Sequence, residues 1–434
     1  MTDKAYSITA GELAELSEGQ LPDPLVSSRH LIYNSPAALA YNSPGAQGFG
    51  VKRAGLAVPG SVMLLVSPGC CGRNTTVLSQ TGGYGKRFFY YLLDETDIVT
   101  GRHLKMIPQA VCRIVEALSE KPSMVMICLT CVDALLGTDM EVVCRQAQEQ
   151  AGLPVRPCYM YALTREGKKP PMVHVRESIY SLLEPAPRRN SRTVNILGHF
   201  APLTDDCELY DVLHSFGITC INEISRMKSY DQYLGMSRAN FNLVLNAEAL
   251  PAAEDLSRRL GIPYIFMKRM YRPEKMDKQY RLLAGALGQT VSLQEEKEAA
   301  AAAAADFRDR HADIRIAVGE ACNANAFELS LALLEAGLCV TEIFANISRE
   351  DFFYIRQIAA ICPQTRIYSN LEPTMLYYDC SDRPADLTIG KDAAYYHPRA
   401  AHLAWNEDIQ PFGFSGIRRF YESCQAALAQ GGRA

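Results

Sequence analysis

The chain lacks three features that would place it in a narrow class. No run of apolar residues approaches the roughly 18 that span a bilayer, so we predict no membrane segment. Basic residues are not in excess, because 44 Lys and Arg stand against 48 Asp and Glu. We therefore expect no nucleic-acid partner. Residues 1–20 are polar and lack the basic and apolar segments of a signal peptide, so we expect a cytoplasmic protein.

The composition is that of an ordinary folded protein. Hydrophobic residues make up 48% of the chain and charged residues 21%, which argues against extensive disorder. A length of 434 residues exceeds the usual size of one hydrophobic core, so we expect several domains.

Three stretches repeat one order: a short apolar run, a loop with Gly or Asn, and an amphipathic segment. This order predicts an α/β fold of three tandem Rossmann-like, doubly wound units with parallel sheets, because strands buried on both faces are almost wholly apolar. We place the units at residues 1–188, 189–292 and 293–434, the last opening with a connecting helix that contains seven consecutive alanines.

The predicted elements follow the apolar runs. The expected strands are Ser61–Val66, Ile98–Val99, Met124–Cys128 and Val155–Tyr161 in the first unit, Thr193–Leu197, Cys220–Ile221, Phe241–Leu245 and Pro263–Phe266 in the second, and Ile314–Val318, Val340–Ile343, Thr365–Tyr368 and Asp386–Ile389 in the third. The expected helices are Met106–Ser119, Cys207–Phe216, Ala252–Leu260, Gln294–Phe307 and Ala326–Leu338.

Fourteen cysteines are a high count for a protein of a reducing compartment, which needs no disulfides to fold. Isolated cysteines in apolar segments, such as Cys112, Cys220, Cys339 and Cys424, are typical of small buried thiols. Two clusters differ from these. Cys70 and Cys71 follow the Ser61–Val66 strand, and Cys128 and Cys131 lie at the end of the next apolar strand.

Because parallel strands end at the same edge of a sheet, the two thiol loops are expected to converge. Soft thiolates from separate loops suit an iron–sulfur cluster or zinc. A zinc site of these four cysteines is disfavoured, since adjacent cysteines bind one ion awkwardly and Cys128 lies within the strand. A thiol-redox role for Cys128-Leu-Thr-Cys131 is also disfavoured, since no helix N-terminus that lowers a thiol pKa is evident.

Three signatures in this order resemble the nitrogenase component 1 family. They are Pro68-Gly-Cys-Cys-Gly72, Asp94-Glu-Thr-Asp-Ile-Val-Thr-Gly101 and Thr130-Cys-Val-Asp-Ala-Leu-Leu-Gly-Thr-Asp139. The family includes molybdenum–iron protein subunits, their cofactor-assembly homologues, and subunits of dark-operative protochlorophyllide reductase and nickel-sirohydrochlorin reductive cyclase. Near the end of the chain, Gly413-Phe-Ser-Gly-Ile-Arg-Arg-Phe420 resembles the family's closing Gly-aromatic-x-Gly helix entry, so the likeness covers essentially the whole chain.

The resemblance implies an iron–sulfur cluster at the interface of two homologous subunits. Cys71 and Cys131 fall on two of the family's ligand positions. The family's earliest ligand has no counterpart, because Tyr33–Gly50 contains no cysteine. Cys70, an oxygen ligand such as Ser43, or a partner residue could complete the shell. A homodimer that supplies Cys71 and Cys131 twice would hold a 4Fe–4S cluster, and a heterodimer with a related chain satisfies the same count.

The resemblance also implies what this chain does. In true nitrogenases a middle-domain cysteine and a histidine of the closing motif hold the large metal cofactor. Here Ile224–Tyr233 contains no cysteine and Phe412 precedes Gly413, so dinitrogen is not the expected substrate. We expect a reductase subunit that takes electrons from an ATP-dependent iron protein and reduces a small molecule. The alternative is a non-catalytic scaffold for metal-cluster or cofactor assembly.

Other motifs carry weaker signals. Gly82-Gly-Tyr-Gly-Lys86 lacks a preceding strand and the Walker spacing, so we expect no ATP site in this chain. His199 follows a predicted strand end and is the candidate for a substrate-cavity residue. The histidines His214, His397 and His402 are expected to be surface or core residues. Tyr84, Tyr90 and Tyr91 are expected to pack in the fold.

Overall fold

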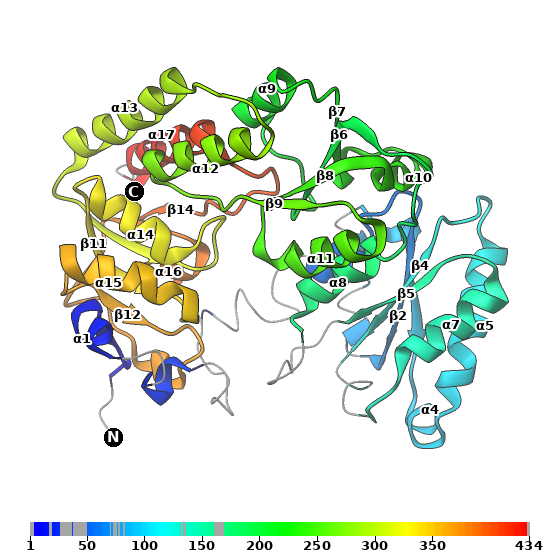
Figure 1. The fold of residues 1–434 in the computed structure, drawn as a ribbon. Helices are drawn as coiled ribbons and strands as arrows, with labels where there is room; N and C mark the ends of the chain where they lie inside the picture. Colours follow the sequence, from blue (N-terminus) through cyan, green and yellow to red (C-terminus); the bar gives the residue numbers. More distant parts are fainter. Residues whose placement is uncertain are drawn as a thin grey trace. The chain divides into compact units, whose positions relative to one another are not determined.

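A computed structural model describes residues 4–16, 20–26, 37, 50–69, 71–72, 76, 79–80, 83–130, 132, 136–159 and 169–431. By packing, the chain divides into two compact units. The terminal unit comprises Met1–Ser43, Leu203–Phe216 and Arg269–Ala434, and the central unit comprises Pro44–Pro202 and Gly217–Lys268. The described residues form three sheets, two of four strands and one of six (Figure 1). The predicted α/β class with parallel sheets is confirmed.

The first sheet of the central unit has the strand order β3-β2-β4-β5, and all its pairs are parallel. Its strands are β2 (Val62–Ser67), β3 (Phe88–Leu92), β4 (Val125–Leu129) and β5 (Val155–Tyr159). Every residue of β2 and β4 is buried, which explains why both read as unbroken apolar runs. One face packs against α5 (Arg102–Ala117) and α7 (Met140–Ala151), and the other against α2 (Gly50–Gly55) and α8 (Pro171–Tyr180).

The strand predicted at Ile98–Val99 is wrong. These residues lie in helix α4 (Glu95–Thr100), and the strand at this place in the sheet is β3. The Asp94 side chain caps the helix by accepting a hydrogen bond from the Asp97 N–H at 2.7 Å, and Gly101 ends it in the left-handed conformation. The strand propensity of the β-branched residues Ile98 and Val99 is small compared with the stabilisation that capping gives at both ends of this helix.

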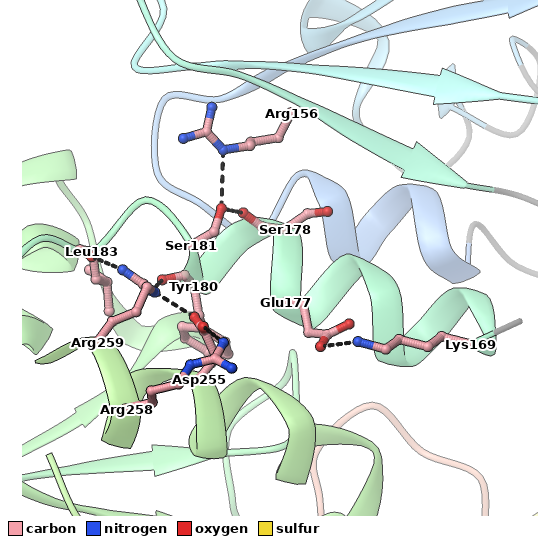
Figure 2. Close-up of polar contacts among 10 residues, drawn as sticks. All are labelled: Arg156, Lys169, Glu177, Ser178, Tyr180, Ser181, Leu183, Asp255, Arg258 and Arg259. Atoms are coloured by element: carbon pink, nitrogen blue, oxygen red, sulfur yellow. Dashed lines mark hydrogen bonds and ion pairs between the residues drawn. The ribbon is translucent and has the colours of Figure 1, made fainter. Parts of the chain in front are cut away.

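The second sheet of the central unit is also parallel and has the order β7-β6-β8-β9. Its strands are β6 (Asn190–Leu197), β7 (Cys220–Glu223), β8 (Ala239–Val244) and β9 (Tyr264–Phe266), with helices α10 (Tyr230–Leu234) and α11 (Leu250–Leu260). Residues of both central sheets share one hydrophobic core. Helix α8 lies in this shared core, where Arg259 of α11 donates to the carbonyl oxygens of Tyr180 and Leu183 (Figure 2).

The terminal unit is built on a six-stranded sheet, β1-β12-β11-β10-β13-β14, in which only β1 is antiparallel. Its strands are β1 (Ile8–Thr9), β10 (Arg315–Gly319), β11 (Cys339–Phe344), β12 (Arg366–Tyr368), β13 (Leu387–Ile389) and β14 (Ala401–Leu403). Its helices are α1 (Ala10–Glu15), α9 (Glu208–Ser215), α12 (Pro273–Ala286), α13 (Gln294–His311), α14 (Ala326–Glu335), α15 (Phe352–Ile361), α16 (Lys391–Tyr396) and α17 (Gly413–Gly431). The predicted alanine-rich helix is α13, which lies beside α17 (Figure 1).

The predicted unit boundaries after residues 188 and 292 stay a prediction. The sequence did not indicate that the N-terminal strand β1 pairs with β12, far along the chain. Among the described residues, no helix is both long and apolar enough to cross a membrane.

Candidate functional site

The three family-like signatures follow three neighbouring parallel strands. The first follows β2, the second follows β3, and the third begins directly after β4. The β2 strand lies between the other two, with Ser67 opposite Leu92 and Val66 opposite Leu129. All three signatures therefore emerge at the carboxyl edge of one sheet, which is where ligands bind in open α/β sheets.

The loop after β2 is folded tightly around a half-buried thiol. Ser67 is fully buried, and the Gly72 N–H donates to the Pro68 carbonyl oxygen at 3.2 Å, which is the hydrogen bond of a helical turn. Cys71 lies within this turn and is partly exposed. Cys70 lies outside the described residues. The turn fixes the backbone around Cys71 and leaves the thiol partly accessible.

Tyr90 of β3 holds this turn in place. Its hydroxyl donates to the Ser67 carbonyl oxygen at 3.0 Å. Its phenol ring occupies the space that a Cβ at Gly72 would need, so only glycine fits at that position. Tyr90 therefore packs in the fold as predicted, and it braces the loop that carries Cys71.

The second signature forms a charged cap at the same edge. Asp97 accepts a hydrogen bond from Arg102 Nε at 2.6 Å and another from the Tyr91 hydroxyl at 3.3 Å. The Arg102 guanidinium holds the pKa of Asp97 below its usual value. Asp97 is thus engaged with residues on both sides of the signature, and its bond to Arg102 fixes the start of α5.

A buried hydroxyl, that of Thr130, directly follows strand β4. Thr130 is fully buried, and its Oγ1 has no hydrogen-bond partner among the described residues. A buried hydroxyl without a partner is costly, so this atom calls for an explanation. Cys131, the next residue, lies outside the described residues. Ser43, an alternative oxygen ligand, also lies outside them.

Two thiols lie deeper in the sheet. Cys128 of β4 stands opposite Cys158 of β5, and both are fully buried. The hydrogen bond with Cys128 and burial raise the pKa of the Cys158 thiol. Cys128 is therefore part of the core and lies within its strand, as predicted. Of the isolated cysteines, Cys424 is buried and Cys112 is half-buried, but Cys220 and Cys339 are exposed, so the prediction of buried thiols is wrong for these two, which begin the strands β7 and β11.

A lysine is buried on one face of this sheet. Lys52 of α2 is only 3% exposed, and burial lowers its pKa. The groups that favour its charged form are the thiols of Cys128, Cys158 and Cys71. Sequence reasoning missed this residue, because a single lysine in a short helix carries no signal of burial.

Comparisons with known proteins match most of the chain. The model of the family described as nitrogenase component 1 type oxidoreductase matches residues 46–428. The chain belongs to this family. The NifE protein of Rhodobacter capsulatus, described as a nitrogenase iron-molybdenum cofactor biosynthesis protein, is 26% identical over 313 residues, which are 68% of this chain and 64% of that protein. The NifE protein of Rhizobium meliloti is 26% identical over 333 residues, 72% of this chain and 67% of that protein.

Solved structures of nitrogenase share the fold. Nitrogenase Cp1 at pH 6.5 superposes with a TM-score of 0.70 at 16% identity and covers 88% of this chain and 92% of its own. The structure of the same protein at pH 5 gives a TM-score of 0.60 at 14% identity. Both show the nitrogenase component 1 fold for this chain.

Two described side chains at the edge of the first sheet are of types that iron–sulfur sites use. Iron–sulfur clusters are held by cysteine thiolates and tuned by hydrogen bonds to their sulfurs. Cys71 supplies a partly exposed thiol. The Thr130 hydroxyl, which has no partner among the described residues, could donate a hydrogen bond to a cluster sulfur. Within the described part of the chain, no three His, Cys, Asp or Glu side chains converge to hold a metal ion by themselves.

In the closing motif, the start of helix α17 binds the side-chain carboxylate of Glu208 from the same chain. Gly413 begins α17 with a positive φ, and Glu208 of α9 accepts hydrogen bonds from the backbone N–H groups of Phe414 and Ser415. The Tyr280 hydroxyl donates to the same carboxylate at 2.8 Å. Phe412, which precedes the motif, is buried. Glu208 therefore fills the anion-binding end of this helix.

The histidines lie in different surroundings. His199 follows β6 and is half-buried, and the carbonyl oxygen of the preceding Gly198 accepts two hydrogen bonds from the buried Arg176. His397 is buried and lies 2.8 Å from Glu342, so it is a core residue, as expected. His214 is exposed on α9. A role for His199 in a substrate cavity stays a prediction.

The carboxyl edge of the terminal sheet carries a buried acidic network that sequence reasoning also missed. Asn370 donates to Glu320 at 3.0 Å and to Asp392 at 2.6 Å, and Asp392 also accepts the backbone N–H groups of Glu320 and Ala321. Burial raises the pKa of Glu320 to about 7 and also raises that of Asp392. These carboxyls close the edge by bonding to the backbone around it.

Proposed function

We propose that this chain is a reductase subunit that receives electrons through an iron–sulfur cluster shared with a second subunit. The observation that carries the proposal is the convergence of the three signatures at one sheet edge, with a partly exposed thiol at Cys71. Cys71 and Cys131, contributed by each of two subunits, would provide four thiolates for a 4Fe–4S cluster. Cys70 is a further candidate ligand of the cluster.

The electron donor is proposed to be an ATP-dependent iron protein that resembles the nitrogenase reductase. Family membership supports this partner, since the family is named as the first component of a two-component enzyme. The substrate is proposed to be a small molecule other than dinitrogen. Phe412 and Glu208 at the closing motif support this view, because Phe412 has no metal-binding atom and the Glu208 carboxylate already accepts hydrogen bonds from the backbone N–H groups of Phe414 and Ser415.

A second candidate function is a scaffold on which a metal cluster or cofactor is assembled. Its relatives favour it, since the NifE proteins are described as nitrogenase iron-molybdenum cofactor biosynthesis proteins. The two candidates share the cluster site and differ in what leaves it: electrons in one case, and a metal cluster in the other.

Anaerobic purification followed by iron analysis tests the shared site. We expect brown protein whose visible absorbance and iron content are lost in Cys71→Ala and in Cys131→Ala. Cys70→Ser should change them far less, and Cys112→Ser, on α5, serves as the matched control. Iron-free wild-type protein, or unchanged iron in both alanine variants, would contradict the cluster assignment.

A second experiment separates the two functions. The protein is mixed with an iron protein, MgATP and a reductant, and the cluster absorbance is followed. ATP-dependent bleaching of the cluster supports the reductase. Transfer of iron and sulfur to an apo-enzyme without ATP-dependent reduction supports the scaffold.

A further inference from the structure

Trp405 is held in a strained backbone conformation. Its φ is 41°, and in the described part of the chain no other residue except glycine has a positive φ. A bulky side chain rarely adopts this conformation, which persists only where the surrounding structure enforces it. Trp405 follows β14 at the carboxyl edge of the terminal sheet and is 4% exposed. The strain must therefore be balanced by contacts from the loops around it.

The loop between β10 and α14, residues 320–325, supplies these contacts through Asn323. The Asn323 N–H donates to the Trp405 carbonyl oxygen at 2.6 Å, and the Asn323 side-chain amide donates to the Glu407 carbonyl oxygen at 2.8 Å. The Asn323 carbonyl oxygen accepts the Tyr271 hydroxyl at 2.8 Å, and this hydroxyl accepts the indole N–H of Trp405. Both the backbone and the ring of Trp405 therefore depend on where this loop places Asn323.

The start of the same loop is anchored by two acidic side chains. The Glu320 carboxyl accepts the backbone N–H of Asn346 at 2.9 Å and the side-chain amide of Asn370 at 3.0 Å. Asp392 of α16 accepts the backbone N–H groups of Glu320 and Ala321 at 2.9 and 3.1 Å. Among the described residues, every donor that bonds to either carboxyl is an amide N–H group. No basic side chain therefore balances their charge there.

The two carboxyls lie too close together for both to be ionised without cost. The Asn370 side-chain nitrogen lies 3.0 Å from a Glu320 oxygen and 2.6 Å from an Asp392 oxygen. Like charges that share a site shielded from water favour the retention of a proton, and Asp351, directly before α15, adds a third carboxyl that acts in the same sense. Asp392 is 1% exposed, whereas Glu320 is partly exposed. Glu320 is therefore the side chain that can turn toward solvent when it ionises.

We propose that residues 320–325 form a proton-dependent switch: a proton on Glu320 keeps the loop anchored and Trp405 strained, and loss of the proton releases both. The switch is independent of the proposed function, because its residues lie in the terminal unit and none is a proposed cluster ligand.

The direction of the switch follows from the burial of Glu320. Burial raises the pKa of Glu320 from its ordinary value of 4.5 to about 7, so the loop is anchored below this pH and released as the pH rises through it. Other groups near Trp405 titrate elsewhere. Burial raises the pKa of Cys322 to about 12 and also raises that of Tyr271, and it lowers the pKa of His402 from 6.5.

Tryptophan fluorescence tests the switch directly, because the chain contains a single tryptophan. The purified protein is titrated from about pH 5 to about pH 9, and the emission maximum and the quenching by acrylamide are followed. We expect the maximum to shift to longer wavelength and the quenching to increase, in a one-proton transition with a midpoint of about 7. Far-UV circular dichroism should show that the protein stays folded. An emission maximum that does not change over this range in folded protein overturns the inference.

Two variants assign the transition to Glu320. Glu320→Gln cannot ionise, so its emission should stay at the low-pH value of the wild type. Glu320→Ala lacks the anchor, so its emission should stay at the high-pH value. Glu298→Gln changes an exposed glutamate of α13 and is the matched control, which should titrate like the wild type. A wild-type transition in either Glu320 variant overturns the inference.

If neither Glu320 variant folds, amide hydrogen exchange of the wild-type protein decides. Exchange in peptides that cover residues 320–325 and 405–408 should increase above about pH 7, relative to exchange in peptides of α13. An unchanged ratio overturns the inference. The proposed function fails separately, since it fails when the wild-type protein contains no iron, whereas the switch is measured with or without a cluster.

Discussion

Replacing Gly72 with alanine tests how tightly the fold holds the loop that carries Cys71. The phenol ring of Tyr90 occupies the position that an alanine Cβ would take, and the Tyr90 hydroxyl donates to the Ser67 carbonyl oxygen at 3.0 Å. The added methyl must displace either the ring or the turn. Overpacking of this kind costs about 1–3 kcal/mol, and loss of the hydrogen bond costs about 1 kcal/mol more. We therefore expect Gly72→Ala to lower the free energy of unfolding by about 2–4 kcal/mol.

Urea denaturation measures this cost, and two further variants assign it. Tyr90→Phe keeps the ring and removes the hydroxyl, so it should cost only about 1 kcal/mol. The double variant Gly72→Ala with Tyr90→Ala removes the overlapping ring, so its cost should be smaller than the sum of the two single costs by more than about 0.5 kcal/mol. Additive costs, or a Gly72→Ala protein as stable as wild type, would refute the steric argument. Gly72→Ala should also lower the iron content, since the displaced turn contains Cys71.

Two further predictions concern buried carboxyls of the terminal unit. In Glu208→Gln, an amide NH2 faces one of the donors that the carboxylate accepted, so the free energy of unfolding should fall by about 1–3 kcal/mol, and an unchanged urea midpoint would contradict this. Burial raises the pKa of Glu320 from its ordinary value of 4.5 to about 7, so between these values the folded protein holds a proton that the unfolded chain has lost. Stability from this group is complete below pH 4.5 and declines by up to about 1.4 kcal/mol per pH unit as the pH rises toward 7. Glu320→Gln should remove that decline, and urea midpoints measured from about pH 5 to about pH 7 check it, with equal slopes in both proteins counting against it.

Much of the fold could be predicted because its central strands are buried on both faces. The runs at Ser61–Val66 and Met124–Cys128 became β2 and β4 with shifts of one residue, since five apolar residues in a row suit a strand that is covered on both faces. The same reasoning placed the two thiol loops at one edge. It failed at Phe88–Leu92, where three of the five residues are only partly buried and the pattern is therefore less distinct. The partly buried strand was passed over, and a capped helix was read as a strand.

The rest of the site could not be predicted because it depends on tertiary packing. The burial of Lys52 follows from how α2 lies on the sheet, and the bracing role of Tyr90 follows from the parallel pairing of β3 with β2. A sequence pattern reports whether a residue suits an element. It does not report that a lysine ends buried, or that a tyrosine ring fills the space over a glycine.

The side chains at the carboxyl ends of the parallel strands differ between the two units, and this difference bears on which edge we expect to bind a ligand. In the terminal unit the carboxyls of Glu320 and Asp392 are bonded to Asn370 and to nearby backbone, and Glu208 fills the start of α17. Both edges keep one buried oxygen without a hydrogen-bond partner in the described structure, Asn370 Oδ1 in the terminal unit and Thr130 Oγ1 in the central unit. They differ in the groups around it, which are buried carboxyls at the terminal edge and the partly exposed thiol of Cys71 at the central edge. Substitutions at the central edge should therefore change iron content and electron transfer, whereas those at the terminal edge should change stability first.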